Sequence, residues 1–427
     1  MKKKNLDIFF NKDILIYGLG KSGLSAYEFL KKKNNIFLYD DFKKNSKKII
    51  SYKSILKKKI DYIIISPGVD INNCKLSKFL KKNLNKIYSD LDVFYSCYKN
   101  DCITITGTNG KSTTCQLLYE ILSKNDYDVK LVGNIGNPIL STKNIKSKTI
   151  FIVEASSYQL EYSKIFKSKY AAILNISPDH LERHKTLKRY TEAKFKLLKF
   201  QSKKSLSFVK KNDELIEKYL SSQKFNCKII KVNTKSKNKI FSKLKNEYIF
   251  SEANKENLLF VLAILKKFKV KKKLLLKFIE EFKGLKYRQQ IIYQTSDLMI
   301  INDSKSTSFA SSSGLLKMKT NIYWLLGGIY KKGDKFNLLK KYHQNIKAFI
   351  FGKDKKYFSA QFKGKIEYIN CKNLSDAFKK VLTISNNQKS QHKIILFSPS
   401  AASFDDFKNF EHRGFYFNKL VKKYLNV

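Results

Sequence analysis

Residues 106–113 read Thr-Gly-Thr-Asn-Gly-Lys-Ser-Thr, a run of glycines and hydroxyl side chains around one lysine that could hold phosphate groups. The backbone N–H groups of such a turn and the N-terminus of a following helix form a concave anion site. Lys111 can reach a β- or γ-phosphate, and the hydroxyl of Ser112 can ligate Mg²⁺. Gly107 and Gly110 stand closer together than the glycines of the usual phosphate loop. The segment predicts a loop that binds and uses ATP; the alternative is an ordinary strand-to-helix turn.

A second glycine-rich turn lies near the N-terminus, where residues 18–23 read Gly-Leu-Gly-Lys-Ser-Gly. Asp40 stands at the end of the next apolar run, as in a dinucleotide-binding turn. The pattern indicates a phosphorylated nucleotide near a helix N-terminus more specifically than it indicates NAD. A purely structural glycine turn stays open as the alternative.

Polar side chains follow further apolar runs near the phosphate loop. Asn134 lies in the polar turn 133–138, and Glu154 follows the run 149–153. A carboxylate at the end of a strand beside a phosphate loop is well placed to bind Mg²⁺. His180, in the turn after the run 170–174, could bind a second metal ion with Asp179 orienting it. A loop histidine alone is more often a surface residue, but three such loops in succession favour a metal site.

The C-terminal third of the chain repeats this arrangement. Residues 302–307 (Asn-Asp-Ser-Lys-Ser-Thr), the pair Gly327-Gly328 with Lys331, and residues 398–405 each follow an apolar run. Open α/β sheets bind ligands at the carboxyl ends of their strands. These three loops therefore predict a second group of ligand-contacting residues.

The elements that must position these residues alternate between apolar runs and helix-like segments, which predicts an α/β fold. We expect strands at 14–17, 36–39, 62–65, 103–105, 149–153, 170–174, 298–301, 322–326, 348–351 and 393–397, and helices at 22–31, 116–122, 254–268 and 272–282. Residues 201–250 are lysine-rich and predict only strands and turns. We expect three α/β domains in series, at 1–96, 97–285 and 286–427, with the phosphate loop in the central one.

The chain of 427 residues carries a formal net charge of +51, almost entirely from lysine. The lysines are spread over the whole length rather than gathered in one face or tail, as a nucleic-acid site would have them. We interpret the charge as compositional bias. It should still attract anionic substrates, and it makes nonspecific nucleic-acid binding plausible at low salt.

The six cysteines contain no Cys-x-x-Cys pair, so a zinc site or a disulfide framework is not expected. Reduced thiols favour a cytoplasmic location. The N-terminus, residues 1–4, is basic, but charged residues interrupt the apolar stretch that follows, which argues against a signal peptide. We expect no membrane span and a monomer.

Taken in order, these motifs resemble the Mur ligase family of ATP-dependent amide-forming enzymes, over nearly the whole chain. The resemblance rests on Gly-Thr-Asn-Gly-Lys-Ser-Thr, Gly-Asn-Ile-Gly, Glu-x-Ser-Ser-x-Gln-Leu-Glu, Asp-His-x-x-Arg-His, Gly284-Leu285-x-x-Arg288, Asn302-Asp-Ser-Lys-Ser-Thr, Leu-Leu-Gly-Gly and Ser398-Pro-x-x-Ala-Ser. The patterns that begin at Asn302 and at Ser398 resemble the branch of the family that adds D-glutamate. The resemblance implies a three-domain architecture: a Rossmann-like N-terminal domain that binds the UDP substrate, a central phosphate-loop ATPase domain, and a Rossmann-like C-terminal domain that binds the amino acid.

The resemblance also implies roles for individual residues. Lys111, Glu154, His180 and Lys194 match catalytic positions, and Lys194 matches a lysine that is carbamylated in the family. Ser112 matches a ligand of one Mg²⁺, and Glu154 and His180 match ligands of a second. The implied nucleotide-binding positions are Gly107, Thr108, Asn109, Gly110, Lys111, Ser112, Thr113, Asn257, Arg288 and Asp303. The implied substrate-binding positions are Gly18, Gly20, Gly23, Asn134, Lys305, Lys331, Ser403 and Phe407.

The implied activity is that of an ATP-dependent acid–D-amino-acid ligase. It would join D-glutamate to UDP-N-acetylmuramoyl-L-alanine through an acyl phosphate, in peptidoglycan precursor synthesis, and so serve cell-wall biogenesis, cell shape, the cell cycle and cell division. The expected partners are these two substrates and ATP with Mg²⁺, and no specific nucleic acid. On this interpretation the turn at 18–23 would hold the UDP diphosphate.

The chain departs from the family pattern at three places. Ala253 stands before Asn254 where the family often has histidine, Ala155 follows Glu154 in place of leucine, and Asp40-Asp41-Phe42 lacks a basic residue often found near the uracil.

Three alternative functions stay open. They are another ligase of the superfamily, such as a folylpolyglutamate synthase, a phosphate-loop ATPase acting on nucleic acid, and a noncatalytic nucleotide-binding module.

Overall fold

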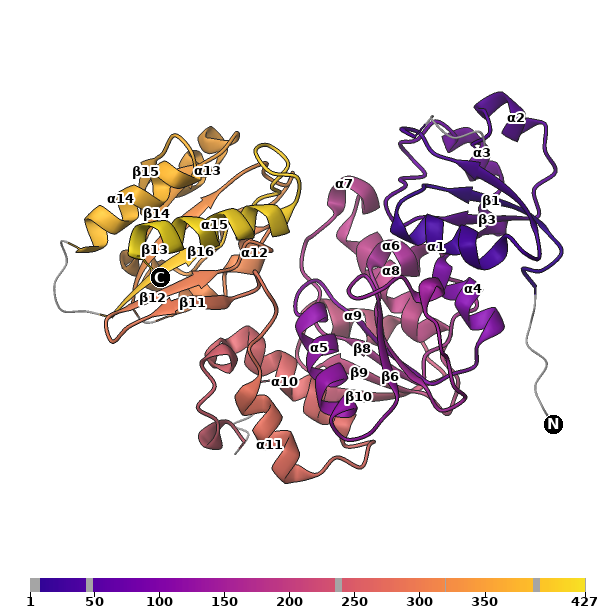
Figure 1. Cartoon of the computed structure of the whole chain (residues 1–427), viewed down its shortest axis with the longest axis horizontal. Helices are drawn as coiled ribbons and strands as arrows, with labels where there is room; N and C mark the ends of the chain where they lie inside the picture. The colour runs from indigo at the N-terminus through magenta and orange to yellow at the C-terminus, as the bar shows by residue number, and fades with distance from the viewer. Residues whose placement is uncertain (1–7, 44–48, 235–239, 319, 387–391, 427) are drawn as a thin grey trace. The chain divides into compact units, whose positions relative to one another are not determined.

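The computed structural model describes residues 8–43, 49–234, 240–318, 320–386 and 392–426; the basic residues 1–4 lie outside this part. It contains three β-sheets with helices between their strands (Figure 1), as the expected α/β class requires. The chain forms two compact units. The first comprises residues 1–176, 180–242 and 256–278, and the second comprises residues 177–179, 243–255 and 279–427.

The first sheet is parallel, in the order β2-β1-β3-β4. Its strands are β1 (Asp13–Tyr17), β2 (Asn35–Tyr39), β3 (Tyr62–Ile65) and β4 (Ile87–Tyr88), and its helices are α1 (Lys21–Leu30), α2 (Tyr52–Leu56), α3 (Ser77–Lys82) and α4 (Asp90–Cys97). Ile14 and Ile16 pack into one hydrophobic cluster, and Leu15 and Tyr17 into another. Because successive side chains of a strand point to opposite faces, β1 is buried on both sides.

The central sheet is also parallel, in the order β10-β9-β8-β5-β7-β6. Its strands are β5 (Cys102–Thr106), β6 (Val129–Gly133), β7 (Ile150–Glu154), β8 (Tyr170–Ile173), β9 (Leu206–Lys210) and β10 (Lys228–Val232). Its helices are α5 (Lys111–Ser123), α6 (Ser157–Tyr162), α7 (Leu181–His184), α8 (Leu187–Lys199) and α9 (Glu214–Ser222). Strand β5 lies between β7 and β8, so the loops that follow these three strands meet at one edge of the sheet.

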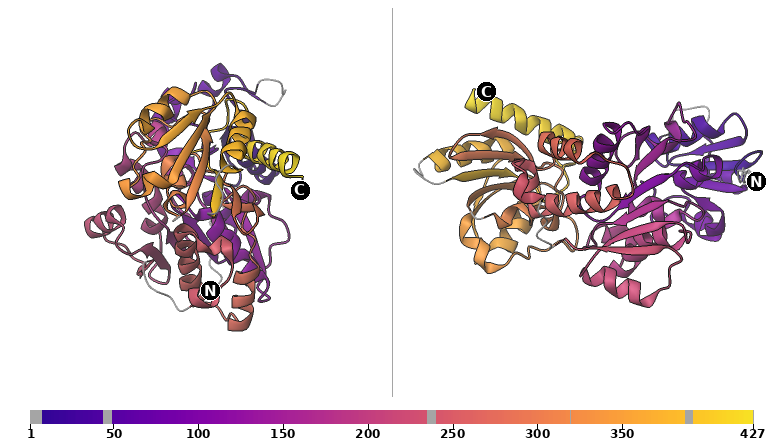
Figure 2. Two further views of the ribbon diagram at one scale, coloured as in Figure 1. Left: turned by 90° about the vertical axis from the view of Figure 1, so that its left-hand side faces the viewer. Right: turned by 90° about the horizontal axis from the view of Figure 1, so that it is seen from below.

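The third sheet has the order β11-β12-β16-β13-β14-β15, and only its edge strand β11 is antiparallel. Its strands are β11 (Gln290–Gln294), β12 (Leu298–Asn302), β13 (Asn321–Gly327), β14 (Ile346–Phe351), β15 (Glu367–Asn370) and β16 (Lys393–Phe397). Helices α14 (Leu374–Asn386) and α15 (Phe410–Leu425) pack on one face, where Figure 2 shows α15 in yellow. Helices α12 (Phe309–Ser312) and α13 (Lys355–Phe362) contribute to the core on the other face.

The remaining elements are helices α10 (Glu252–Leu265) and α11 (Lys272–Glu281) and the short 3₁₀ helices η1 (Leu84–Lys86), η2 (Ile139–Ser141), η3 (Phe241–Lys243), η4 (Glu247–Phe250), η5 (Leu315–Lys317) and η6 (Lys340–Asn345).

All six cysteines are free; Cys102, Cys115, Cys227 and Cys371 are buried. Within the described residues, no helix combines the length and the apolar character needed to cross a bilayer.

The expected strands are present with bounds that differ by one or two residues, whereas the expectation for residues 201–250 was incomplete. This region contains the helix α9, whose N-cap is Asp213: its side chain accepts the N–H of Ile216. Ile216 is its fully buried contact with the core. Helix α10 starts at Glu252 and ends at Leu265, three residues before the expected end.

Candidate active site in the central sheet

The loop between β5 and α5 is fastened to the neighbouring strand β8 through Asn175. The side chain of Asn175 accepts the N–H of Asn109 at 2.9 Å and donates to the carbonyl of Asn109 at 3.2 Å. The N–H of Thr108 donates to the carbonyl of Asn175 at 3.0 Å. The backbone of this loop is therefore set by the strand that carries the His180 loop.

Glycine is required at two positions of the same loop. Gly107 and Gly110 have φ values of +152° and +83°. A Cβ on Gly110 would lie 2.0 Å from Oδ1 of Asn257, a buried side chain of α10. The loop thus adopts a backbone that other residues reach only with strain, and Asn257 lies directly against it.

Lys111 and Ser112 begin helix α5. The ammonium of Lys111 donates to the carbonyls of Gly107 and Thr108, both at 2.8 Å. The Ser112 hydroxyl donates to Glu154 at the end of β7, over 2.6 Å. Thr113 is buried in the first turn of the helix.

Glu154 joins two of the predicted loops. Its Oε2 accepts the Ser112 hydroxyl and its Oε1 accepts the side-chain amide of Asn134 at 2.7 Å. The N–H of Asn134 donates to the Glu154 carbonyl at 2.9 Å, and a Cβ on Gly133 would come 2.4 Å from the same carbonyl oxygen. The carboxylate therefore lies between the phosphate loop and the turn 133–138.

Lys194 approaches the phosphate loop from helix α8. Its side chain is 1% exposed, and its ammonium donates to the carbonyl of Gly107 at 2.8 Å. It also lies 4.5 Å from the ring centroid of Tyr190, whose hydroxyl is 3.2 Å from that of Thr108. A buried lysine at this point is costly unless its surroundings or its chemical form compensate its charge.

His180 caps the N-terminus of α7 with a left-handed backbone, φ 56°. A hydrogen bond of 2.7 Å joins its Nδ1 to the hydroxyl of Tyr158 on α6, and Glu182 lies 3.5 Å from the same nitrogen. The Tyr158 ring stacks on His184, with centroids 5.5 Å apart. Burial lowers the pKa of His184 to about 4, so this ring is neutral near pH 7.

The glycine-rich turn of the first sheet is closed by Ser66 and Asp40. Gly18 has a φ of +90°, and its carbonyl accepts the Ser66 hydroxyl at 2.6 Å. A Cβ on Gly23 would lie 1.8 Å from that carbonyl oxygen, whereas Gly20, the N-cap of α1, has open space beside it. The Asp40 carboxylate accepts the N–H groups of Leu19, Phe42 and Lys43, at 2.7, 2.9 and 3.1 Å.

In the second unit, Asp303 occupies the buried centre of the predicted loops. Its carboxylate accepts the Ser398 hydroxyl at 2.9 Å and the N–H of Gln289 at 3.1 Å. Burial raises the pKa of Asp303 to about 7. The loops after β12 and β16 are therefore joined by a direct side-chain hydrogen bond.

The other predicted residues of the second unit make contacts of their own. The guanidinium of Arg288 and the ammonium of Lys305 lie 5.9 and 4.0 Å from the ring centroid of Phe410. Lys331 forms an ion pair of 2.6 Å with Asp179. Ser403 is buried, and its carbonyl accepts the N–H of Phe407 at 2.9 Å.

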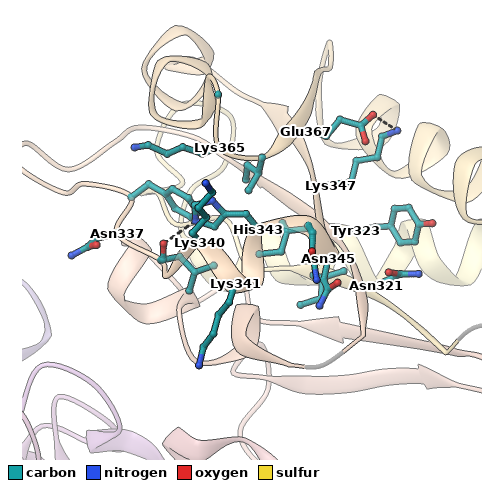
Figure 3. Close-up of a pocket in the computed structure, with 17 residues that line it drawn as sticks. Asn321, Tyr323, Asn337, Lys340, Lys341, His343, Asn345, Lys347, Lys365 and Glu367 are labelled. Atoms are coloured by element: carbon teal, nitrogen blue, oxygen red, sulfur yellow. Dashed lines mark hydrogen bonds and ion pairs between the residues drawn. The ribbon is translucent and has the colours of Figure 1, made fainter.

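A surface cavity of about 1070 Å³ lies elsewhere in the second unit, at the amino ends of β13, β14 and β15 (Figure 3). Lys340, Lys341, His343 and Lys365 are among the residues that line it. None of the predicted site residues does. The carboxyl ends of the strands, where Asp303 and Ser398 lie, are at the opposite edge of the sheet.

Comparison with known proteins identifies the family. The pattern of the Mur ligase middle domain matches residues 105–317. The UDP-N-acetylmuramoylalanine--D-glutamate ligase of Rickettsia felis is 35% identical, covering 96% of this chain and 96% of the relative. The enzyme of the same name from Francisella tularensis is 32% identical, covering 96% and 95%.

This chain belongs to the Mur ligase family. It is a ligase, as the sequence motifs indicate.

Solved Mur ligases share the fold. The UDP-N-acetylmuramate-alanine ligase of Thermotoga maritima has a TM-score of 0.57 at 17% identity, covering 97% of this chain and all of that one. The MurF ligase of the same organism, solved in complex with ADP, has a TM-score of 0.57 at 16% identity, covering 99% and 100%. The expected α/β Mur ligase architecture is confirmed.

The structure brings together the predicted residues of the central sheet: the phosphate loop, Glu154, Asn134 and Lys194 are linked by direct hydrogen bonds. Sequence reasoning assigned no role to Tyr158 or Arg183, although both lie inside the quoted family motifs. Their contacts depend on the packing of α6 against α7, which motif spacing does not reveal. Asn175 could have been recognised, since an amide directly after a buried strand lies at the ligand edge of the sheet.

The oxygen donors at Ser112 and Glu154 suit Mg²⁺, which prefers hard ligands. Among the described residues, no group of three or more histidine, cysteine, aspartate or glutamate side chains gathers as a metal cage. Mg²⁺ commonly binds through one or two protein groups, with phosphate oxygens and water as its other ligands. The residues present therefore fit a nucleotide-bound Mg²⁺.

Proposed function

We propose that this ligase adds D-glutamate to UDP-N-acetylmuramoyl-L-alanine in the cytoplasm, at the expense of ATP, and so serves peptidoglycan precursor synthesis. The observation that carries the proposal is the cluster of Lys111, Ser112, Glu154, Asn134 and Lys194 around the turn after β5. Near-full-length similarity to ligases named for D-glutamate supports this choice of amino acid.

The phosphate loop would activate the substrate carboxylate. A carboxylate is a poor acyl donor, so one of its oxygens attacks the γ-phosphorus of ATP, the bond from that phosphorus to ADP breaks, and an acyl phosphate forms. Lys111 and the N-terminus of α5 would offset the negative charge on the phosphates. Asn134 and Ser112, which hold Glu154, would fix the polar wall of this site.

The amine of D-glutamate then attacks the acyl carbon, a tetrahedral oxyanion forms, and phosphate leaves with the bonding electron pair while the amine loses a proton. We assign the two carboxylates of D-glutamate to Lys331 and the loop of Ser403 and Phe407, with Lys305 nearby. We assign the adenosine and phosphates to Asn257, Arg288 and Asp303. These assignments follow the three predicted domains, 1–96, 97–285 and 286–427.

Ser112 would hold one Mg²⁺ and Glu154 with His180 a second. When bound, the metal supplies positive charge to the phosphoryl oxygens. Lys194 would carry a carbamate, formed when its neutral amine adds CO₂ and releases a proton. The modification turns a buried cation into an anion, which suits a position beside a metal better than an ammonium does.

The test of the function is phosphate release from ATP with UDP-N-acetylmuramoyl-L-alanine, with and without D-glutamate. We expect release to depend on both substrates and the product to gain one glutamate in mass. Turnover with L-lysine, meso-diaminopimelate or D-alanyl-D-alanine equal to that with D-glutamate would contradict the amino-acid assignment. Lys331→Ala should raise the KM for D-glutamate far more than that for ATP.

Lys194→Ala tests the carbamate. We expect the variant to lose ligation and to recover part of it when acetate is added, because a free carboxylate can occupy the vacated anionic position. Lys188→Ala, which removes an exposed lysine of the same helix, is the control and should remain active without acetate. Loss of activity that acetate does not restore at any concentration would count against the carbamate.

A further inference from the structure

Arg183, on helix α7, connects the two halves of the first unit. Its side chain is 7% exposed, and its Nη1 donates to the carbonyl of Pro67, in the turn after β3. This contact spans 116 residues of sequence. It therefore joins the first sheet to the loop of the central sheet that carries His180.

The turn at Pro67 is the support of the glycine-rich loop. The hydroxyl of Ser66 donates to the Gly18 carbonyl at 2.6 Å. A Cβ on Gly18 would lie 2.7 Å from Val69 and 2.8 Å from Cβ of Ser66, so the loop and the turn are in close contact. A shift of Pro67 would move the loop to which we assign the UDP diphosphate.

At its other side, the guanidinium lies over Tyr158. Its Cζ is 4.0 Å from the centroid of that ring, which is within the range of a cation–π interaction. The Tyr158 hydroxyl is joined to Nδ1 of His180 over 2.7 Å. A continuous path of contacts thus runs from His180 through Tyr158 and Arg183 to Pro67 and the glycine-rich loop.

The guanidinium uses few of its donors in hydrogen bonds of ordinary geometry. Its Nε and Nη2 are buried without such a bond, Oε2 of Glu161 lies 4.0 Å from Nε, and the Tyr162 hydroxyl also interacts with the guanidinium. A buried arginine kept only for stability would be expected to use more of its donors. This observation favours a role for Arg183 in placing its neighbours.

We propose that Arg183 and Tyr158 are positioning residues that set the distance between the UDP end and the carboxylate end of the bound substrate. The inference rests on the proposed function. Because the substrate must reach from the glycine-rich turn to the Glu154 loop, the two loops have to be held in register. Misplacing reacting groups by about 1 Å can cost on the order of 100-fold in rate.

The test separates binding of the UDP group and of ATP from the placement of the substrate carboxylate relative to the UDP end. For Arg183→Met, we expect the affinity for UDP alone and the KM for Mg·ATP to stay within about twofold of the wild type. We expect kcat with UDP-N-acetylmuramoyl-L-alanine to fall on the order of 10- to 100-fold. Turnover of N-acetylmuramoyl-L-alanine without UDP should stay unchanged, because this acceptor does not use the first loop.

Three further variants complete the comparison. Arg183→Lys should recover part of kcat, since an ammonium can still donate to Pro67 and lie over Tyr158. Tyr158→Phe keeps the ring but removes the hydroxyl, and should lower kcat with UDP affinity intact. Arg189→Met removes an exposed arginine of α8 and should behave as the wild type. If Arg183→Met fails to melt cooperatively, Arg183→Lys and Tyr158→Phe decide the question by the same measurements.

Two results would overturn the proposal. Unchanged kcat with the full substrate would show that the path is not needed, and equal losses for the substrates with and without UDP would show a general structural role. The proposed function is judged separately: a wild-type chain that does not release phosphate with UDP-N-acetylmuramoyl-L-alanine and D-glutamate refutes the function before any variant is compared.

Discussion

At the scale of single residues, the site depends on ionisable side chains that are buried. Lys194 and Glu154 are each 1% exposed, and Asp303 is 5% exposed. Each is hydrogen-bonded to a loop beside it: Lys194 donates to Gly107, whereas Glu154 and Asp303 accept hydrogen bonds, so each connects two segments of chain. Removing such a group leaves its partners buried without a bond, which costs more than the bond itself contributes.

Asp303 makes stability depend on pH. Its folded-state pKa of about 7 is above that of an aspartate in an unfolded chain, because burial disfavours the charged form. The folded state therefore holds the proton more tightly, and the stability it contributes is complete below about pH 4 and lost as the pH rises through about 7. Asp303→Asn should flatten the fall in unfolding free energy between about pH 4 and about pH 7, by on the order of 1 kcal/mol per pH unit.

The measurement is urea unfolding of both proteins at several pH values. Asp90 and Asp334, whose pKa values burial raises to about 6, contribute the same slope to wild type and variant, so the difference isolates Asp303. Asp297→Asn, an exposed aspartate before β12, is the control. Parallel curves for the wild type and Asp303→Asn would mean that Asp303 is ionised in the folded protein throughout this range.

At the scale of elements, helix α4 is attached to the loop after α6 by one carboxylate. Oδ1 of Asp92 accepts the N–H groups of Lys164, Ile165 and Phe166 at 3.0, 2.8 and 3.0 Å, together with the hydroxyl of Ser163. Its Oδ2 accepts the N–H of Ser89 and closes the capping box of α4. This joint connects the end of the first sheet to the central sheet.

Asp92→Ala should lower the free energy of unfolding by about 3–5 kcal/mol, since several buried N–H groups lose their acceptor together. Asp101→Ala removes an aspartate from a half-exposed ion pair with Lys169 and should cost at most about 1 kcal/mol. Chemical denaturation, followed by far-UV circular dichroism, measures the unfolding free energy of both variants. A loss for Asp92→Ala no larger than that of the control would show that water replaces the carboxylate.

The sequence predicted those elements whose patterns are local. Strands such as β3 and β16 are short apolar runs, which are typical of buried strands. The glycines of the phosphate loop indicate a backbone with positive φ values. Helix α9 was missed because lysines and polar residues surround its few apolar positions. The edge strand β11 was missed because its apolar run, between two glutamines, is only three residues long and half-buried. Long-range contacts such as Arg183 with Pro67 leave no local pattern to find.

At the scale of the whole molecule, the net charge of +51 should act on every anionic ligand. We expect the KM values for ATP and UDP-N-acetylmuramoyl-L-alanine to rise when salt is increased from 50 to about 300 mM, as screening shortens the reach of the lysines. DNA should bind at low salt and be released at high salt. It should not stimulate phosphate release.

Thermal stability, measured over the same salt series, is the control for this prediction. It separates an effect of salt on the fold from an effect of salt on the attraction of anionic ligands. DNA-stimulated ATP hydrolysis that persists at about 300 mM salt would instead favour an ATPase acting on nucleic acid.

The buried cysteines give the two units separate chemical reporters. Cys102, Cys115 and Cys227 lie in the first unit and Cys371 in the second, all of them closed to solvent and none cross-linked. A thiol reagent can alkylate such a group only when the surrounding structure opens. The order in which tryptic peptides gain the label under rising denaturant would therefore reveal which unit opens first, in the unmodified chain and without any introduced probe.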